Sequence, residues 1–140
     1  MIVLWRRTDA SGARRCATIL WMPGRVLIVD DHPRFRATAR RALECDGWTV
    51  VGEAADGADG LAEARRLVPD LVLLDIGLPD ISGLSVARRL ADDAPEVAVV
   101  LVSTQDAGDF ADLAAAHGAR GFLPKAELSG AALDGLLARR

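Results

Sequence analysis

The sequence is poor in cysteine, in lysine and in long apolar runs. Its two cysteines, Cys16 and Cys45, lie in no spacing typical of metal ligands or of a disulfide framework. We therefore expect both to be reduced thiols in a cytoplasmic protein. No apolar run approaches the roughly 18 residues that a membrane span needs, so we expect no membrane association.

Acidic residues outnumber basic ones, and their excess is larger once the N-terminal segment is set aside. Residues 1–24 hold four arginines against one aspartate, a net charge of +3, whereas the whole chain has a formal net charge of −3. The remainder of the chain therefore carries −6. An acidic body lacks the basic face that neutralises phosphates in nucleic-acid binding, so we expect no DNA binding by this chain.

The N-terminal segment also differs from the rest in composition. Two of the three tryptophans fall in residues 1–24, and the segment has no helical or strand periodicity. We expect a basic and mobile N-terminal extension over 1–24, followed by a single domain over 25–140. Met22 lies shortly before the first expected strand and is an alternative translation start.

Short apolar runs are abundant, and they alternate with helical patterns. Continuous apolar runs are typical of strands that are buried on both faces, as in parallel sheets. The expected strands are 26–29, 48–53, 71–75, 97–102 and 121–125. The expected helices are 33–46, 56–68, 85–90, 106–117 and 128–137. Five strand–helix repeats predict a flavodoxin-like (βα)5 fold of the α/β class, with a doubly wound parallel sheet in the order 2-1-3-4-5.

Polar side chains stand where four of these strands end. The carboxyl ends of parallel strands meet at one edge of a sheet, so these side chains are expected to converge. Carboxylates about 4 Å apart repel each other by roughly 1 to 4 kcal/mol, and Mg²⁺ is the compensating cation that carboxylate and carbonyl oxygens favour. A lysine and a hydroxyl beside such an ion suit a phosphoryl group that a carboxylate attacks. The residues are Asp30, Asp31, Asp75, Ser103, Thr104 and Lys125.

Each of these residues also has a purely structural interpretation when it is taken alone. Asp30 or Asp31 could cap the helix that begins at Pro33, and Asp75 could begin a turn. His32 is expected to be an exposed residue beside the site. Their joint occurrence at successive strand ends favours a functional site over these separate interpretations.

The motifs at the strand ends resemble the receiver domain of bacterial response regulators. They are Val29–His32, Leu74–Gly83, Ser103–Thr104 and Gly121–Lys125, and the resemblance covers about residues 25–138. It implies a role in two-component phosphorelay signalling. The protein would be a phosphoacceptor that assists its own phosphoryl transfer and dephosphorylation, and not an enzyme acting on an external substrate.

The resemblance implies a role for each acid. Asp75 would accept a phosphoryl group from a sensor histidine kinase or a histidine phosphotransfer protein. Asp31 and Asp75 would ligate Mg²⁺ directly, Asp30 would do so through water, and the carbonyl of Gly77 would complete the site.

The resemblance also implies a switch. Ser103 would move to hydrogen-bond the phosphoryl oxygen, Lys125 would pair with it, and Phe122 would turn inward. This would repack the surface of the fourth helix, fifth strand and fifth helix, which would bind a downstream protein or a second copy of the chain. Thr104 is bulkier than the small residue often found after the switch hydroxyl, and we expect it to restrict access to the phosphoryl group.

Two further expectations concern the range of functions. The chain ends at Arg140, directly after the last expected helix, so we expect a stand-alone receiver. An alternative is a receiver-like binding module that works without phosphorylation. A phosphohydrolase is not expected, because such enzymes carry a second acid two residues after the nucleophile, where this chain has Gly77.

Overall fold

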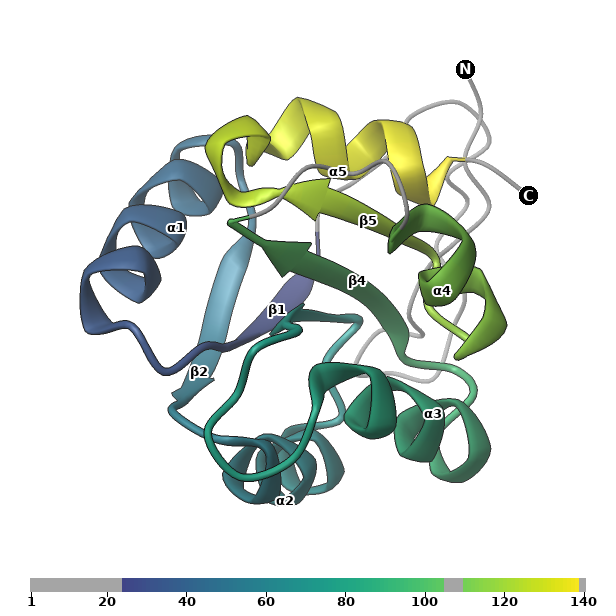
Figure 1. The fold of residues 1–140 in the computed structure, drawn as a ribbon. Helices are drawn as coiled ribbons and strands as arrows, with labels where there is room; N and C mark the ends of the chain where they lie inside the picture. The colour runs from purple at the N-terminus through teal and green to yellow at the C-terminus, as the bar shows by residue number, and fades with distance from the viewer. Residues whose placement is uncertain (1–23, 105–109, 139–140) are drawn as a thin grey trace, which may run out of the picture.

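The structure is a computed structural model that describes residues 24–104 and 110–138. Its centre is a five-stranded parallel sheet in the order β2-β1-β3-β4-β5 (Figure 1). The expected fold and strand order are therefore confirmed. The strands are β1 Arg25–Val29, β2 Thr49–Ala54, β3 Leu71–Asp75, β4 Ala98–Ser103 and β5 Gly121–Pro124.

Helices cover both faces of the sheet. Figure 1 shows α1 and α5 on one face, with α2, α3 and α4 on the other. In the part of the chain that the structure describes, no helix is long and apolar enough to cross a membrane. The helices are α1 Pro33–Cys45, α2 Gly57–Leu67, α3 Gly83–Asp93, α4 Phe110–Ala116 and α5 Gly130–Leu137, and a short 3-10 turn spans Lys125–Glu127.

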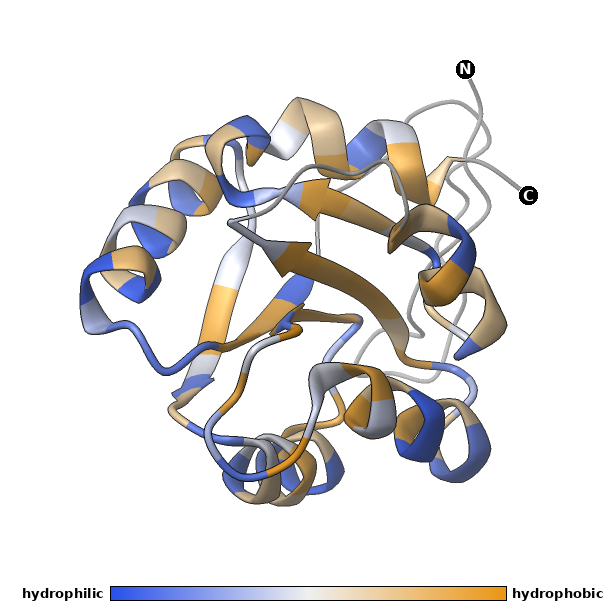
Figure 2. Ribbon diagram, in the orientation of Figure 1, coloured by the Kyte–Doolittle hydropathy of each residue, from blue (hydrophilic) through white to orange (hydrophobic). Residues whose placement is uncertain are grey.

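The continuous apolar runs of the strands supply two cores at once. Neighbouring residues of a strand point to opposite faces of the sheet. Leu27 and Val29 therefore pack on the side of α2, α3 and α4, whereas Val26 and Ile28 pack on the side of α1 and α5. Figure 2 shows the same arrangement as apolar strands at the centre and polar residues on the outer faces of the helices. Each fully buried Val, Leu or Ile contributes about 1.5–3 kcal/mol to this packing.

Two helices begin at other residues than the sequence predicted, because serine side chains cap their N-termini. Ser82 Oγ accepts a hydrogen bond from Leu84 N, so α3 begins at Gly83 and not at 85. Ser129 caps α5, which begins after the 3-10 turn and not at 128. The expected start of the fourth helix at 106 and most of the N-terminal extension lie outside the described residues.

Val68 ends α2 in a backbone conformation that its side chain disfavours. Its φ of 45° and ψ of 62° are left-handed, and it is the one residue other than glycine with positive φ in the described segments. Such a conformation costs of order 1–3 kcal/mol for a β-branched residue. The side chain is 50% exposed, so little packing would be lost on replacement.

We therefore expect Val68→Asn to raise the free energy of unfolding by about 1 kcal/mol, because asparagine tolerates the left-handed region. Urea denaturation of the two proteins measures the difference. An unchanged or lower unfolding midpoint for the variant would contradict the assignment of strain to Val68.

Candidate functional site

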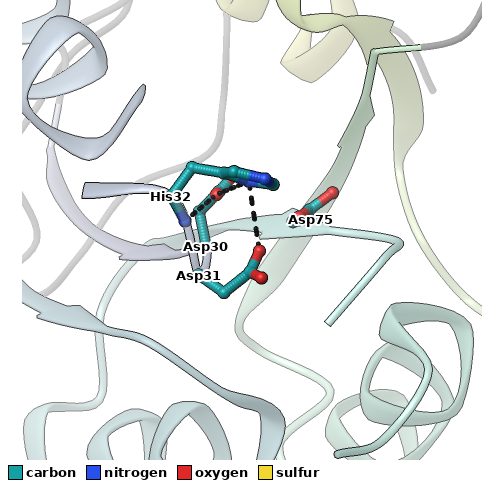
Figure 3. Close-up of side chains that lie close together, drawn as sticks. All are labelled: Asp30, Asp31, His32 and Asp75. Atoms are coloured by element: carbon teal, nitrogen blue, oxygen red, sulfur yellow. Dashed lines mark hydrogen bonds and ion pairs between the residues drawn. The ribbon is translucent and has the colours of Figure 1, made fainter. Parts of the chain in front are cut away.

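The acidic side chains gather at the carboxyl edge of the sheet. Asp30 follows β1 directly and Asp75 is the last residue of β3, and these strands are neighbours with Val29 paired to Leu74. One potential ligand atom from each of Asp30, Asp31, His32 and Asp75 lies within 4.8 Å of the others. Figure 3 shows the four side chains grouped between the ends of the two strands.

The acids after β1 do not cap the following helix. The cap position of α1 is His32, and its side chain makes no capping hydrogen bond. Asp30 Oδ1 instead accepts a hydrogen bond from the backbone N–H of His32 at 2.8 Å, which bends the chain between strand and helix. The capping interpretation is therefore wrong for both Asp30 and Asp31. His32 is exposed beside the cluster, as its position in the sequence predicted.

Lys125 reaches this edge from the end of β5 and pairs with two of the acids. Its Nζ lies 2.6 Å from Asp30 Oδ2 and 3.6 Å from Asp75 Oδ2, and its side chain is 10% exposed. The ammonium also lies 4.5 Å from the centre of the Phe35 ring, a cation–π contact that the sequence did not predict. The single lysine of the chain thus places its ammonium beside two buried carboxylates.

The carboxyl group of Asp75 is held in an unfavourable environment for its charge. Burial raises its pKa most, and the nearby charge of Asp30 raises it further. The ammonium of Lys125 and the N–H of Gly77, which donates to Asp75 Oδ1 at 3.2 Å, act in the opposite direction. The net effect is a raised pKa, so the site favours either a proton or a cation beside Asp75.

This raised pKa predicts that Asp75→Asn stabilises the metal-free protein at neutral pH. Well below the ordinary pKa of 3.8, the carboxyl of Asp75 is protonated in both the folded and the unfolded chain. In that pH range it does not destabilise the folded state. As the pH rises through the raised folded-state pKa, ionisation of the buried carboxyl lowers the free energy of unfolding. The wild type is therefore fully destabilised by this charge at pH 7.

We expect the free energy of unfolding of the variant to exceed that of the wild type by about 1 kcal/mol at pH 7 in the presence of a chelator. The difference should disappear toward pH 3. Asp92→Asn, on the exposed end of α3, serves as the control and should leave stability unchanged. A less stable Asp75→Asn protein at pH 7 would contradict this account.

A pocket of about 250 Å³ opens beside Asp75. Ser103 is half-buried at the end of β4, and the exposed Thr104 follows it. The pocket thus places two hydroxyl side chains and one ammonium around the carboxylate at the end of β3. Its lining consists of His32, Asp75, Ile76, Gly77, Ser103, Thr104, Phe110 and Lys125.

Phe122 lies inward in this structure. It is buried among the core residues on the α4 side of the sheet, and its ring stacks on that of Phe110 with centroids 5.2 Å apart and planes at 25°. The structure therefore shows one buried position of Phe122, and its movement on phosphorylation stays a prediction. Sequence reasoning missed Phe110, because a single aromatic residue in an alanine-rich helix carries no signal of its partner.

Asp80 is a second residue that sequence reasoning missed. Its Oδ1 accepts a hydrogen bond from Gly57 N at 2.7 Å and its Oδ2 accepts one from Ala58 N at 2.9 Å. These N–H groups hold the pKa of Asp80 below its ordinary value. These two hydrogen bonds connect the loop after β3, which contains both Gly77 and Asp80, to the N-terminus of α2.

Comparison with known proteins identifies the family. The model of the response regulator receiver domain matches residues 26–133, and the chain belongs to this family. Receiver domains of this family bind Mg²⁺ at an acidic pocket and act in two-component signalling.

The chain is similar to several proteins that are named as transcriptional or response regulators. It is 46% identical over 103 residues to a Pseudomonas aeruginosa protein named as a transcriptional regulator, a match that covers 74% of this chain and 50% of that protein. It is 42% identical over 106 residues to BvgA of Bordetella pertussis, covering 76% and 51%. The receiver domain of NarL from Mycobacterium tuberculosis superposes with a TM-score of 0.75 at 36% identity, covering 84% of this chain and 99% of that one. The chain spans about half the length of the curated relatives it matches.

Proposed function

We propose that this chain accepts a phosphoryl group on Asp75, with Mg²⁺ bound beside it, and thereby switches a surface that binds a partner. The observation that carries the proposal is that Asp75, Lys125 and Ser103 line the same pocket. A carboxylate, an ammonium and a hydroxyl in this arrangement can attack a phosphorus atom and stabilise the charge on its oxygens.

The donor atoms at the site fit a hard divalent cation. Asp30 Oδ2 and Asp31 Oδ1 are buried and accept no hydrogen bond from the described parts of the chain. Buried carboxylate oxygens of this kind need a cation. Lys125 Nζ lies 2.6 Å from Asp30 Oδ2, whereas the atom beside Asp31 Oδ1 is His32 Nδ1, at 3.1 Å. Asp30, Asp31, Asp75 and the carbonyl of Gly77 would hold Mg²⁺, which supplies positive charge to the oxygens of the transferred group.

Several residues that line the pocket would each have a separate role in phosphoryl transfer. A carboxylate oxygen of Asp75 forms the new bond to phosphorus while the bond between phosphorus and the donor breaks. Lys125 pairs with the phosphoryl oxygens, and the hydroxyl of Ser103 donates a hydrogen bond to one of them. Thr104 lies exposed at the same pocket and restricts the approach of water, which would prolong the phosphorylated state.

The proposal extends to partners and organisation. The phosphoryl donor is a sensor histidine kinase or a histidine phosphotransfer protein in the cytoplasm, and the output is a downstream protein or a second copy of the chain bound at α4, β5 and α5. Residues 25–140 act as the receiver without DNA binding of their own. The relatives, which are about twice as long and are named as regulators of transcription, favour a competing possibility in which a further domain gives the output.

Phosphoryl uptake from acetyl phosphate or phosphoramidate tests the proposal. Intact mass should show one added phosphoryl group on the wild type with Mg²⁺, and none after chelation or in Asp75→Asn. Asp92→Asn, which removes an exposed acid far along α3, should behave like the wild type. Uptake by Asp75→Asn at the wild-type rate would overturn the assignment of Asp75. A folded wild type that binds Mg²⁺ but takes up no phosphate would favour the binding module that works without phosphorylation.

Thermal unfolding tests the metal separately from the phosphoryl chemistry. Mg²⁺ at ten times its dissociation constant should stabilise the folded state by about 1.4 kcal/mol, because the ion binds the folded chain alone. The melting temperature should rise accordingly in the wild type. A melting temperature unmoved by millimolar Mg²⁺ would count against the proposed metal site.

A further inference from the structure

His32 adds a nitrogen donor to a cluster that otherwise offers only oxygen. Its Nδ1 lies 3.0 Å from Asp30 Oδ1 and 3.1 Å from Asp31 Oδ1. Figure 3 shows the imidazole ring turned toward both carboxylates, with Asp75 close by. The backbone N–H of His32, bonded to Asp30 Oδ1 at 2.8 Å, fixes the start of the side chain. The ring is therefore held at the cluster although the side chain is 61% exposed.

The contact between the ring and Asp30 is a hydrogen bond in the metal-free protein, and its length also matches the separation of neighbouring ligands on one metal ion. Adjacent ligands of an octahedral ion with bonds of about 2.1 Å lie about 3 Å apart. Lys125 Nζ lies 2.6 Å from Asp30 Oδ2, so the ammonium takes one oxygen of this carboxylate and leaves Oδ1 on the side of the imidazole. Asp31 Oδ1 is buried and accepts no hydrogen bond within 24–104 and 110–138. Asp30 Oδ1 and Asp31 Oδ1 thus both lie within 3.1 Å of one ring nitrogen, whereas Lys125 Nζ lies 3.5 Å from that nitrogen.

We propose that His32 is a ligand of the metal ion at this cluster, so that the site binds a first-row transition ion such as Co²⁺ more tightly than Mg²⁺. Imidazole is a favourable ligand for such ions, whereas Mg²⁺ prefers oxygen donors and its own water. The inference rests on the proposed function, because it concerns the same acids, but it assigns a residue and a class of ion that the phosphoryl chemistry does not require.

Metal titration of the unphosphorylated protein tests the inference. The dissociation constants for Mg²⁺ and Co²⁺ are measured by calorimetry for the wild type, for His32→Phe and for His117→Phe. His117 is the one other histidine of the chain and lies at the end of α4, where Nδ1 is 2.8 Å from Leu113 O, so His117→Phe is a matched control. Circular dichroism checks that all three proteins are folded.

The expected result is a selective loss. In His32→Phe the preference for Co²⁺ over Mg²⁺ should fall by about tenfold or more, with the affinity for Mg²⁺ changed by less than about threefold. His117→Phe should match the wild type. The Co²⁺-loaded wild type should also show a hyperfine-shifted imidazole N–H proton in its NMR spectrum, and this signal should be missing from His32→Phe.

The possible failures are distinguishable. An equal Co²⁺ preference in the wild type and His32→Phe, with Mg²⁺ bound by both, would overturn the role of His32 and leave the proposed function standing. A folded wild type that binds neither ion would overturn the metal site and the role of His32 together.

Discussion

Replacing Lys125 by methionine is expected to lower the free energy of unfolding by about 3 kcal/mol in the absence of a divalent cation. Lys125 Nζ lies 2.6 Å from Asp30 Oδ2, and Asp30 has no exposed surface. Methionine keeps the length and the apolar stem of the side chain. The lowering of the free energy of unfolding therefore measures the effect of removing the ammonium charge. Removing the ammonium leaves a buried carboxylate without its counter-ion, and such a charge costs far more than an exposed ion pair contributes.

A double-mutant cycle provides the control for Lys125→Met. If the loss arises from the unpaired charge, Asp30→Asn in the same protein should recover most of it, and the two substitutions should be strongly non-additive. Chemical denaturation at pH 7 measures all four proteins. Additive effects, or a Lys125→Met protein as stable as the wild type, would show that the pair at 2.6 Å does not stabilise the site. Adding Mg²⁺ should stabilise Lys125→Met more than the wild type, because the cation then neutralises Asp30 without competition.

The second large effect is expected from Gly83→Ala. Alanine normally stabilises a helix by up to about 1 kcal/mol relative to glycine. Here, however, a Cβ at position 83 would lie 2.2 Å from the carbonyl oxygen of Asp75 and 2.7 Å from the Cα of Ile76. These are backbone atoms at the end of β3, so no side chain can rotate away. We expect a loss of about 2 kcal/mol and a displacement of Asp75 that weakens phosphoryl uptake and Mg²⁺ binding.

Gly135→Ala is the matched control for this prediction. It lies within α5, and a Cβ there would have open space around it. The control should therefore show the ordinary stabilisation of a helix by alanine, opposite in sign to the effect at Gly83. Thermal and urea unfolding of both variants give the comparison. Stabilisation by Gly83→Ala would contradict the close approach of α3 to the end of β3.

The sequence predicts the parts of this fold that depend on local patterns. The run Leu71–Leu74 is apolar throughout and forms most of β3 at the centre of the sheet, where both faces are buried. The same logic predicts the other strands and their parallel order, because five strand–helix repeats with right-handed crossovers permit few arrangements. It also brings Asp30, Asp31 and Asp75 to one edge, since strand ends share that edge in a parallel sheet.

The sequence does not predict contacts that depend on packing between distant segments. Asp80 bonds to the N-terminus of α2 from 22 and 23 residues away, and nothing in the local motif distinguishes it from a turn residue. The stack of Phe110 on Phe122 and the approach of Lys125 to Phe35 are of the same kind. Such contacts depend on the position and angle at which each helix packs on the sheet. Sequence periodicity alone does not determine that position.

The most direct test of the central claim is to identify the residue that carries the phosphoryl group. After uptake from a small phosphodonor, borohydride reduction converts an aspartyl phosphate to homoserine, and peptide mass spectrometry locates it. We expect homoserine at position 75, and aspartate unchanged at positions 30 and 31. Homoserine at either of the two positions after β1, or phosphoryl uptake with no homoserine at position 75, would contradict the assignment of Asp75 as the phosphoacceptor.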